Sequence, residues 1–408
     1  MSRIRIKCFG AIKGTYQGND GWLDISKVTM FIGNQGSGKS TVAKLISTFT
    51  WIEKALVRGD YDKKWFERKN RLGQLIEYHR LENYLCRDTV IEYQGDAYYV
   101  AYQGGSLIIE EYAKSVYPLP QIMYVPAERN FIAYVKKTKE LRLSSNSMKD
   151  FLTEFDKAKN DTKVLSLPIN DVNVEYDKLN DTLNIKGKDY KVKLTEASSG
   201  FQSFVPLYLV SHYLSNSVKK QSENKEPMSD KEMDRFRKGV VNIWENDDLT
   251  DEQKRIAISV LASKFNKTAF INIVEEPEQN LFPSSQWQML QSLLTFNNMN
   301  DGNKLIITTH SPYLINYLSI AIQGEYLKTK IFPNYGDLFS ELSKVISEKS
   351  LISSDSVAVY QLDEKKGVVT KLSASMGIPS DRNYLNDMLR EGNQMFDKLL
   401  EIEEKSQK

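Results

Sequence analysis

A glycine-rich segment that ends in a lysine and two hydroxyl residues is the part of the sequence best suited to chemistry. Its residues are Gly33, Asn34, Gln35, Gly36, Ser37, Gly38, Lys39, Ser40 and Thr41. They fit the spacing G-x-x-x-x-G-K-S/T, follow an apolar strand pattern at 28–32 and open a helical pattern at 41–52. Glycines let the backbone curl so that successive N–H groups point at phosphate oxygens, and the helix N-terminus adds its positive end.

This loop predicts specific roles for its last residues. Lys39 would neutralise the β- and γ-phosphates of a nucleotide, and the Ser40 hydroxyl would bind Mg²⁺. An ordinary glycine turn before a helix is the alternative interpretation. The octapeptide arises by chance in on the order of 1% of chains of this length, and the strand–loop–helix context lowers that further. We therefore predict a phosphate-binding loop.

A pair of carboxylates ends a second apolar strand pattern. Glu275 and Glu276 come directly after residues 270–274. A carboxylate at the end of a buried strand can hold Mg²⁺ through water, and a second acid beside it can polarise the water that attacks a phosphate. We expect Glu275 to be the magnesium acid and Glu276 the general base. A solvated strand end is the alternative, and the phosphate loop in the same chain favours the catalytic interpretation.

Two further positions gain interest from their order along the chain. His310 ends the apolar stretch 305–309, where a neutral imidazole could bind and sense a γ-phosphate. Ser198, Ser199 and Gly200 form a polar turn that opens an apolar helix pattern at 200–214, a second place where free N–H groups and a hydroxyl attract an anion. Alone, the histidine would more often be structural and the turn merely a helix cap. His79 and His212 are expected to be structural or surface residues.

The elements around these residues predict an α/β fold. The short unbroken apolar stretches at 269–274 and 304–308 are typical of parallel strands buried on both faces. The apolar stretch at 122–125, which Pro126 ends, predicts another buried strand. Residues 89–111 and 172–194 carry the alternation and turn residues of antiparallel hairpins. We expect a mixed central sheet flanked by helices, with an antiparallel β subdomain and a helical insertion.

Several helices have recognisable boundaries. Ser229 with Glu232, and Thr250 with Gln253, each fit the capping box. Residues 51–71 are expected to be helical and largely exposed. Residues 131–170 and 216–267 are expected to be helical insertions in a single domain spanning 1–408, and residues 382–404 an amphipathic helix without a long heptad array.

Composition bounds the class of protein. The chain has 408 residues, 41% of them hydrophobic and 26% charged, with a formal net charge of +2. Cys8 and Cys86 are too few for a disulfide framework, and no apolar run is long enough to cross a bilayer. We expect a cytoplasmic protein without a membrane partner. Basic side chains that could grip phosphates, or simply be solvated, are Lys54, Arg58, Lys63, Lys64, Arg68, Lys69, Arg71, Lys136, Lys137, Lys139 and Arg142.

The order of the motifs resembles the ABC-type ATPases, specifically the soluble branch containing RecF, the SMC proteins and the OLD-type ATPases. In that family the turn before the helix is the signature motif, usually L-S-G-G-Q, and residues 197–202 here are A-S-S-G-F-Q. The resemblance implies a P-loop NTPase with ABC-ATPase head architecture that binds ATP and Mg²⁺. It also implies that Ser198, Ser199 and Gly200 bind the γ-phosphate of ATP held by the opposite subunit, in a head-to-tail dimer with two sandwiched nucleotides. His310 falls at the family's switch histidine, and residues 278–283 at its D-loop.

Two positions depart from the family pattern. The magnesium acid is usually aspartate and is Glu275 here, as is common in the soluble branch. The family commonly ends a strand with V-P-Q, and the corresponding residues 125–127 are V-P-A. Glu128 is a candidate to replace that glutamine.

These features support one leading hypothesis and two alternatives. The leading one is an ATPase that dimerises on ATP, as a homodimer or higher oligomer, and couples its nucleotide state to DNA or to an effector such as a nuclease encoded nearby. By analogy of fold, such proteins serve anti-phage defence or DNA repair. The alternatives are the nucleotide-binding subunit of a transporter and an ATP-bound scaffold that does not hydrolyse.

Overall fold

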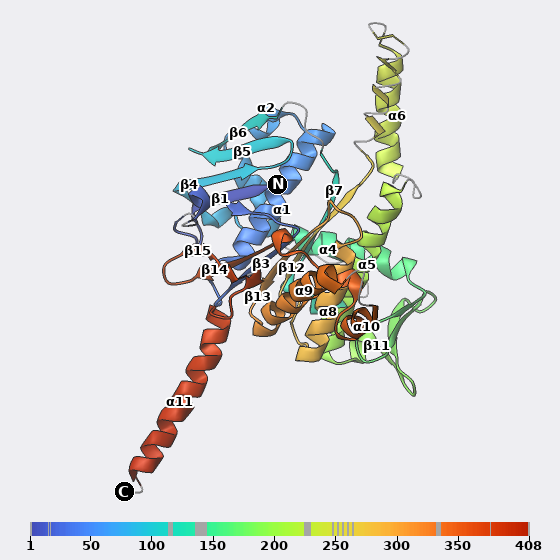
Figure 1. Ribbon diagram of the computed structural model, residues 1–408. Coiled ribbons are helices and arrows are strands. Elements are labelled where there is room, and N and C mark those ends of the chain that lie inside the picture. The colour runs from blue at the N-terminus through green and yellow to red at the C-terminus, as the bar shows by residue number, and fades with distance from the viewer. Residues whose placement is uncertain are drawn as a thin grey trace.

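The structure is a computed structural model that places the sequence motifs on a layered α/β body (Figure 1). It describes residues 2–14, 16, 18–112, 117–134, 145–223, 230–246, 249–250, 253–254, 257–258, 261–262, 265–331, 336–375 and 377–406. Ser229 and the basic residues Lys136, Lys137, Lys139 and Arg142 lie outside these ranges.

A central sheet of six strands forms the middle layer, in the order β15–β14–β3–β13–β12–β7. Its strands are β3 (Val28–Gly33), β7 (Pro120–Val125), β12 (Ala269–Glu275), β13 (Lys304–Thr309), β14 (Val357–Asp363) and β15 (Val368–Lys371). All neighbours are parallel except β15, which pairs antiparallel with β14. Every residue of β3 and β12 is buried, because helices or a second sheet cover both faces.

One face of the sheet packs on α1 (Lys39–Arg58) and an antiparallel sheet. That second sheet has the order β2–β1–β4–β5–β6. Its strands are β1 (Arg3–Phe9), β2 (Leu23–Asp24), β4 (Leu85–Gln94), β5 (Tyr98–Gln103) and β6 (Ser106–Glu111). The buried carboxylate of Glu53 on α1 ties the layers together, accepting hydrogen bonds from the Tyr93 hydroxyl (3.0 Å) and the Ala97 N–H (2.7 Å). Burial raises the pKa of Glu53.

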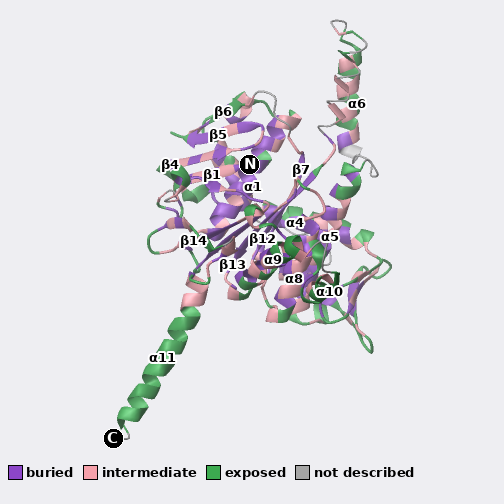
Figure 2. Cartoon of the chain, viewed as in Figure 1, coloured by how far each residue is buried: buried purple, intermediate pink, exposed green. Residues whose placement is uncertain are grey.

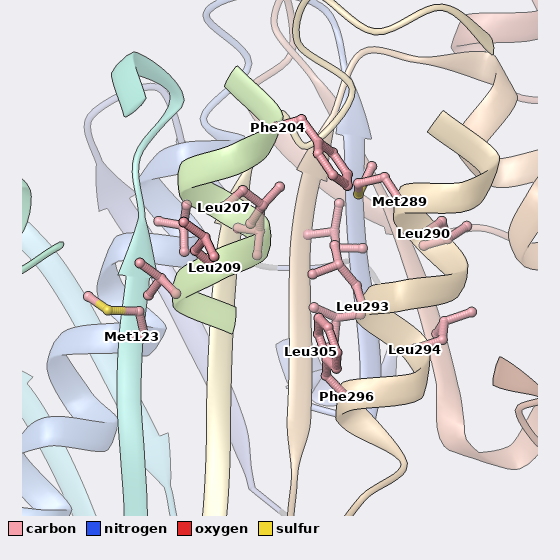
Figure 3. Close-up of a cluster of buried hydrophobic side chains, with 14 of the residues drawn as sticks. Met123, Phe204, Leu207, Leu209, Met289, Leu290, Leu293, Leu294, Phe296 and Leu305 are labelled. Carbon is pink, nitrogen blue, oxygen red and sulfur yellow. The ribbon is translucent and has the colours of Figure 1, made fainter. Parts of the chain in front are cut away.

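The opposite face packs on a helical layer, and Figure 3 shows its core. The helices here are α4 (Asn146–Asp161), α5 (Ser199–Ser222), α8 (Pro283–Asn297), α9 (Pro312–Ile331) and α10 (Gly336–Val345). Phe204 of α5, Met289 and Leu293 of α8 and Leu305 of β13 belong to one buried cluster. This cluster fixes the position of α5, which begins at the serine–glycine turn.

Smaller elements extend from the body. A four-stranded sheet contains β8 (Val164–Ser166), β9 (Asn173–Asp177), β10 (Thr182–Lys186) and β11 (Lys191–Lys193). A two-stranded sheet pairs β16 (Ala374–Ser375) with β17 (Ile378–Pro379). Two helices project from the body, α6 (Asp230–Trp244) and α11 (Tyr384–Ser406).

The predicted parallel strands and hairpins are confirmed, but three helix predictions need correction. The helix expected at 41–52 begins at Lys39 and continues to Arg58, and the one expected at 200–214 continues to Ser222. Residues 51–71 do not form one exposed helix, because Gly59 ends α1 in a left-handed conformation (φ 71°). The chain continues through α2 (Lys63–Phe66), whose Phe66 is buried, to α3 (Arg71–Ile76).

The capping box at Thr250 is confirmed. The Thr250 hydroxyl accepts from the Gln253 N–H (3.3 Å), and the Gln253 side chain accepts from the Thr250 N–H (2.9 Å).

Candidate nucleotide-binding site

The phosphate loop connects β3 to α1 and depends on three glycines in left-handed or related backbone conformations. Gly33, Gly36 and Gly38 have φ values of 147°, 76° and 99°. A Cβ atom added to Gly33 would lie 2.4 Å from the carbonyl oxygen of Leu362 on β14, so the loop passes too close to that strand for any side chain. This conformation turns the loop around the N-terminus of α1, where free N–H groups can meet an anion.

Lys39 is folded onto the loop that it would serve. Only 5% of the residue is exposed. Its ammonium donates to the carbonyl oxygens of Gly33 (3.0 Å) and Asn34 (2.8 Å). Burial lowers the pKa of Lys39 to about 8, and the nearby carboxylates, Glu276 first among them, oppose that shift. The side chain is therefore held in place and electrostatically linked to the acidic strand end before any nucleotide binds.

Glu275 and Glu276 lie at the same edge of the central sheet as the phosphate loop. In the sheet β13 lies between β3 and β12, and parallel strands present their carboxyl ends together. Glu275 ends β12 and is 5% exposed. Its Oε2 accepts from the Ala127 N–H (3.3 Å), whereas its Oε1 is buried without a hydrogen-bond partner. A buried carboxylate oxygen without a donor fits a role in binding a cation or its water shell.

Glu276 and His310 form a contact across β12 and β13. The imidazole Nε2 lies 3.4 Å from a carboxylate oxygen of Glu276, and both side chains are about one-third exposed. The hydrogen bond from His310 lowers the pKa of Glu276 against an opposing effect of burial. Glu276 has a positive φ of 41° and its N–H donates to the Thr308 carbonyl (2.8 Å). A backbone held in this uncommon conformation directs the side chain away from the strand.

Glu278 supports the histidine from the other side. Its carboxylate accepts from the His310 N–H (2.7 Å) and from the Thr309 hydroxyl (2.7 Å). Burial raises the pKa of Glu278. This glutamate therefore fixes the end of β13 rather than facing solvent.

Arg129 is the residue that sequence reasoning missed. It is fully buried, and its guanidinium donates to four backbone carbonyls: Pro126 (3.3 Å), Ser203 (3.1 Å), Glu275 (2.8 Å) and Glu276 (2.7 Å). Burial lowers its pKa to about 10. Arg129 thus joins the acidic strand end to the N-terminal part of α5. An arginine in a polar stretch after a strand gives no sequence signal of such burial.

The serine–glycine turn is placed beside the segment after the acids. Ser198 precedes α5, and the Asn280 amide donates to the hydroxyl of Ser203, the fifth residue of that helix (2.9 Å). A Cβ on Gly200 would lie 3.0 Å from the Asn280 carbonyl oxygen. Among the residues that the structure describes, no hydrogen bond or ion pair joins Ser198, Ser199 or Gly200 to the phosphate loop of the same chain.

Glu128 lies close to Glu275 without bonding to it. It is exposed and lines, with Glu275 and Lys44, a cleft of about 270 Å³. His79 lines the same cleft but is buried against the Tyr124 ring (4.7 Å between centroids), and burial lowers its pKa to about 3. His212 packs within α5 against Tyr208. These two histidines are neutral packing residues in this arrangement.

No group of three or more metal-binding side chains occurs among the described residues. Ser40 and Glu275 would therefore need the oxygens of a nucleotide or water to complete a Mg²⁺ site, as Mg²⁺ commonly does. None of the helices in the described ranges is long and apolar enough to span a membrane.

Strand β3, an inner strand of the sheet, runs through the glycine-rich loop into α1, which begins at the buried Lys39. Acidic side chains lie at the end of the nearby strand β12. This arrangement defines a P-loop nucleotide-binding protein. Residues 252–315, which include the acidic strand and His310, match the AAA ATPase domain family. That match is consistent with an ABC-type ATPase of the RecF/SMC-like branch. No curated protein sequence matches the chain.

Among solved structures, the chain is similar to SMC heads and to a transporter cassette. The SMC head domain from Thermotoga maritima is 11% identical, with 91% of this chain and 98% of that chain covered, at a TM-score of 0.35. An Smc head domain bound to the C-terminal domain of ScpA from Pyrococcus furiosus is 9% identical, with 98% and 100% covered, at 0.35. A dimeric bacterial ABC transporter cassette is 13% identical, with 78% and 91% covered, at 0.21.

Proposed function

We propose that this protein binds ATP with Mg²⁺ at the phosphate loop and hydrolyses it with Glu276 as the general base. The observation that supports this proposal is that Lys39, Glu276 and His310 lie at one edge of the sheet. Glu276 contacts His310, and its negative charge opposes the lowering of the Lys39 pKa. When bound, Mg²⁺ supplies positive charge that offsets the charge of the phosphates. Ser40 and Glu275 would hold it.

In the ATP complex, the Lys39 ammonium exchanges the carbonyl oxygens of Gly33 and Asn34 for phosphate oxygens. The lowered pKa of Glu276 keeps its carboxylate ionised at neutral pH, so that it can accept a proton from water that attacks the γ-phosphorus. His310 orients that carboxylate and donates from Nε2 when this nitrogen carries the proton. Glu278 holds the histidine backbone in position for both contacts.

We further propose that two chains associate head to tail on ATP, with Ser198, Ser199 and Gly200 of one chain closing the site of the other. The turn lies beside Asn280, in the segment that follows the acidic strand end, and this position supports that arrangement. So does Phe282, which is 75% exposed in the segment that packs beside the turn. The closed dimer would pass its state to an effector protein, such as a nuclease, or to DNA, in defence or repair.

Direct DNA binding by residues 54–71 has less support than the sequence indicated. Arg58 approaches Asp60 (3.6 Å) and Lys63 approaches Glu111 (3.3 Å), so part of this charge is neutralised. Lys64, Arg68 and Lys69 are exposed and could meet a phosphate backbone. A gel shift with and without ATP at low salt tests this, and an unshifted duplex under both conditions excludes direct binding.

Phosphate release tests the enzyme proposal. Wild type should release phosphate from ATP, and Glu276→Gln should bind ATP while losing activity by at least about 100-fold. Glu110→Gln on the exposed end of β6 is the matched control and should behave as wild type. A Glu276→Gln protein as active as wild type would exclude Glu276 as the base, and wild type without turnover would favour the scaffold alternative. Co-purification with a membrane protein would instead favour the transporter alternative.

A further inference from the structure

Helix α11 leaves the body of the molecule after its first turn (Figure 1). The Tyr384 hydroxyl donates to the Asp363 carboxylate (2.7 Å), and Leu385 packs on the edge of the core. Every residue from Met388 to Ser406 is exposed, as the colouring of Figure 2 shows along the helix. The body therefore anchors the start of α11 and leaves about five turns in solvent.

The exposed part of α11 is not a polar spacer. Large apolar side chains that are at least 44% exposed are Met388, Leu389, Met395, Phe396, Leu399, Leu400 and Ile402. Isolated helices of this length are marginal in water, and a contiguous apolar stripe on a soluble protein usually marks an interface. The helix therefore requires a partner surface that matches its shape.

The spacing of these residues specifies that shape. Met388, Met395, Leu399 and Ile402 lie at a and d positions of a heptad frame. The other a positions are held by Leu385, which packs on the body, and by Gly392 and Ser406, which add no apolar side chain. Leu389 and Phe396 lie at e positions and widen the stripe on one side. A helix with an apolar repeat of this period winds around a partner helix as a left-handed coiled coil and does not fit an irregular groove.

Charge placement favours a second copy of the same helix in parallel. In a parallel pair, the g residue of one heptad faces the e residue of the partner's next heptad. Here Lys398 is at g and Glu403 is at the following e position. Two-fold symmetry would form this Lys–Glu pair twice, whereas antiparallel pairing sets g against g and e against e.

We propose that α11 forms a parallel two-stranded coiled coil with α11 of a second copy of this chain, and that this association needs no nucleotide. It is separate from the ATP-dependent contact through the phosphate loops. The pairing would keep two nucleotide-binding bodies close together after ATP is lost. Re-closure would then occur between tethered bodies at high effective concentration.

The first test measures the mass of the full-length, nucleotide-free protein by sedimentation equilibrium at roughly 10–100 µM. Wild type should be a dimer, and Met395→Glu with Ile402→Glu should be a monomer. Asn393→Glu with Gln394→Glu is the matched control, because it adds the same charges at b and c positions and should leave the dimer intact. A monomeric wild type, a trimer or tetramer, or a dimer that survives Met395→Glu with Ile402→Glu would each overturn the proposal.

The second test concerns the parallel register and uses charge reversal. Lys398→Glu alone and Glu403→Lys alone each place like charges opposite one another and should weaken the dimer several-fold. The combination of both changes restores the pair and should return the dissociation constant to near the wild-type value. A double variant as weak as the single ones would overturn the parallel arrangement. Circular dichroism should show in every variant a helix content that differs from wild type by no more than the α11 residues, which separates lost pairing from unfolding of the body.

Discussion

The Nε2 atom of His310 lies 3.4 Å from the Glu276 carboxylate, although the two residues are separated by a helix and a strand in the sequence. The parallel register that sets Glu275 opposite Thr308 produces this contact. Because the histidine lowers the pKa of Glu276, it keeps the base ionised over a wider pH range. It also makes the acid limb of the activity depend on residue 310.

The pH profile of turnover therefore tests the pair. Activity should fall on the acid side only below the ordinary glutamate range, about pH 4.3. His310→Ala should move that acid limb to higher pH, because the carboxylate loses its hydrogen bond. The same lowered pKa stabilises the fold above the pKa of unfolded glutamate, and this contribution is lost as the pH falls through the lowered value. An acid limb that does not move in His310→Ala would contradict the coupling.

Nucleotide affinity should depend on the charge of Lys39. Burial lowers its pKa to about 8 in the empty protein, so a growing fraction of the side chain is neutral as the pH rises through that value. ATP affinity measured by calorimetry should decrease from pH 7 to pH 9 for wild type. Lys39→Met should bind ATP weakly, with little dependence on pH over this range. An unchanged wild-type affinity would show that Lys39 stays charged or makes no phosphate contact.

Arg129 should be a major contributor to stability. Arg129→Met removes the guanidinium donor from four backbone carbonyl groups, of which that of Glu276 still accepts from the Gln279 N–H, at a cost of about 3–5 kcal/mol in the free energy of unfolding. Arg129→Lys should recover only part of that loss, because an ammonium cannot reproduce the planar set of donors. Arg68→Met at an exposed position is the control and should change stability by less than about 0.5 kcal/mol in urea unfolding. Equal effects at both positions would contradict the structure.

Gly33→Ala should distort the phosphate loop. The added methyl group meets the Leu362 carbonyl oxygen at 2.4 Å, and φ is 147°. We expect loss of ATP binding together with destabilisation larger than that of Gly104→Ala. Gly104 also has positive φ (64°) but open space around it, so the control isolates the backbone cost of about 1 kcal/mol. Similar unfolding midpoints for the two variants would show that the close approach to β14 is relaxed in solution.

Much of the site could be predicted because its signals are local. The loop from Gly33 to Thr41 needs glycines for its backbone and a helix start for its anion site, and both are properties of neighbouring residues. The buried strands before Glu275 and His310 were recognisable from unbroken apolar stretches, as was the α/β class. Helix ends were less predictable, since α5 continues beyond its apolar part by packing in the helical layer.

Other features depend on residues far apart in the chain. Arg129 and Glu278 are charged residues that the sequence alone would place in solvent. Arg129 is buried and the half-buried Glu278 turns its carboxylate inward, because backbone groups from other segments satisfy them. In α11, the apolar stripe predicted an amphipathic helix, but only the tertiary structure showed that the body leaves it uncovered. The sequence by itself determined the phosphate loop, the acidic strand and the helix patterns, because local backbone sterics and periodicity control them. The tertiary structure decided which charges are buried and which apolar surfaces remain open, because those depend on the register of distant strands and the packing between layers.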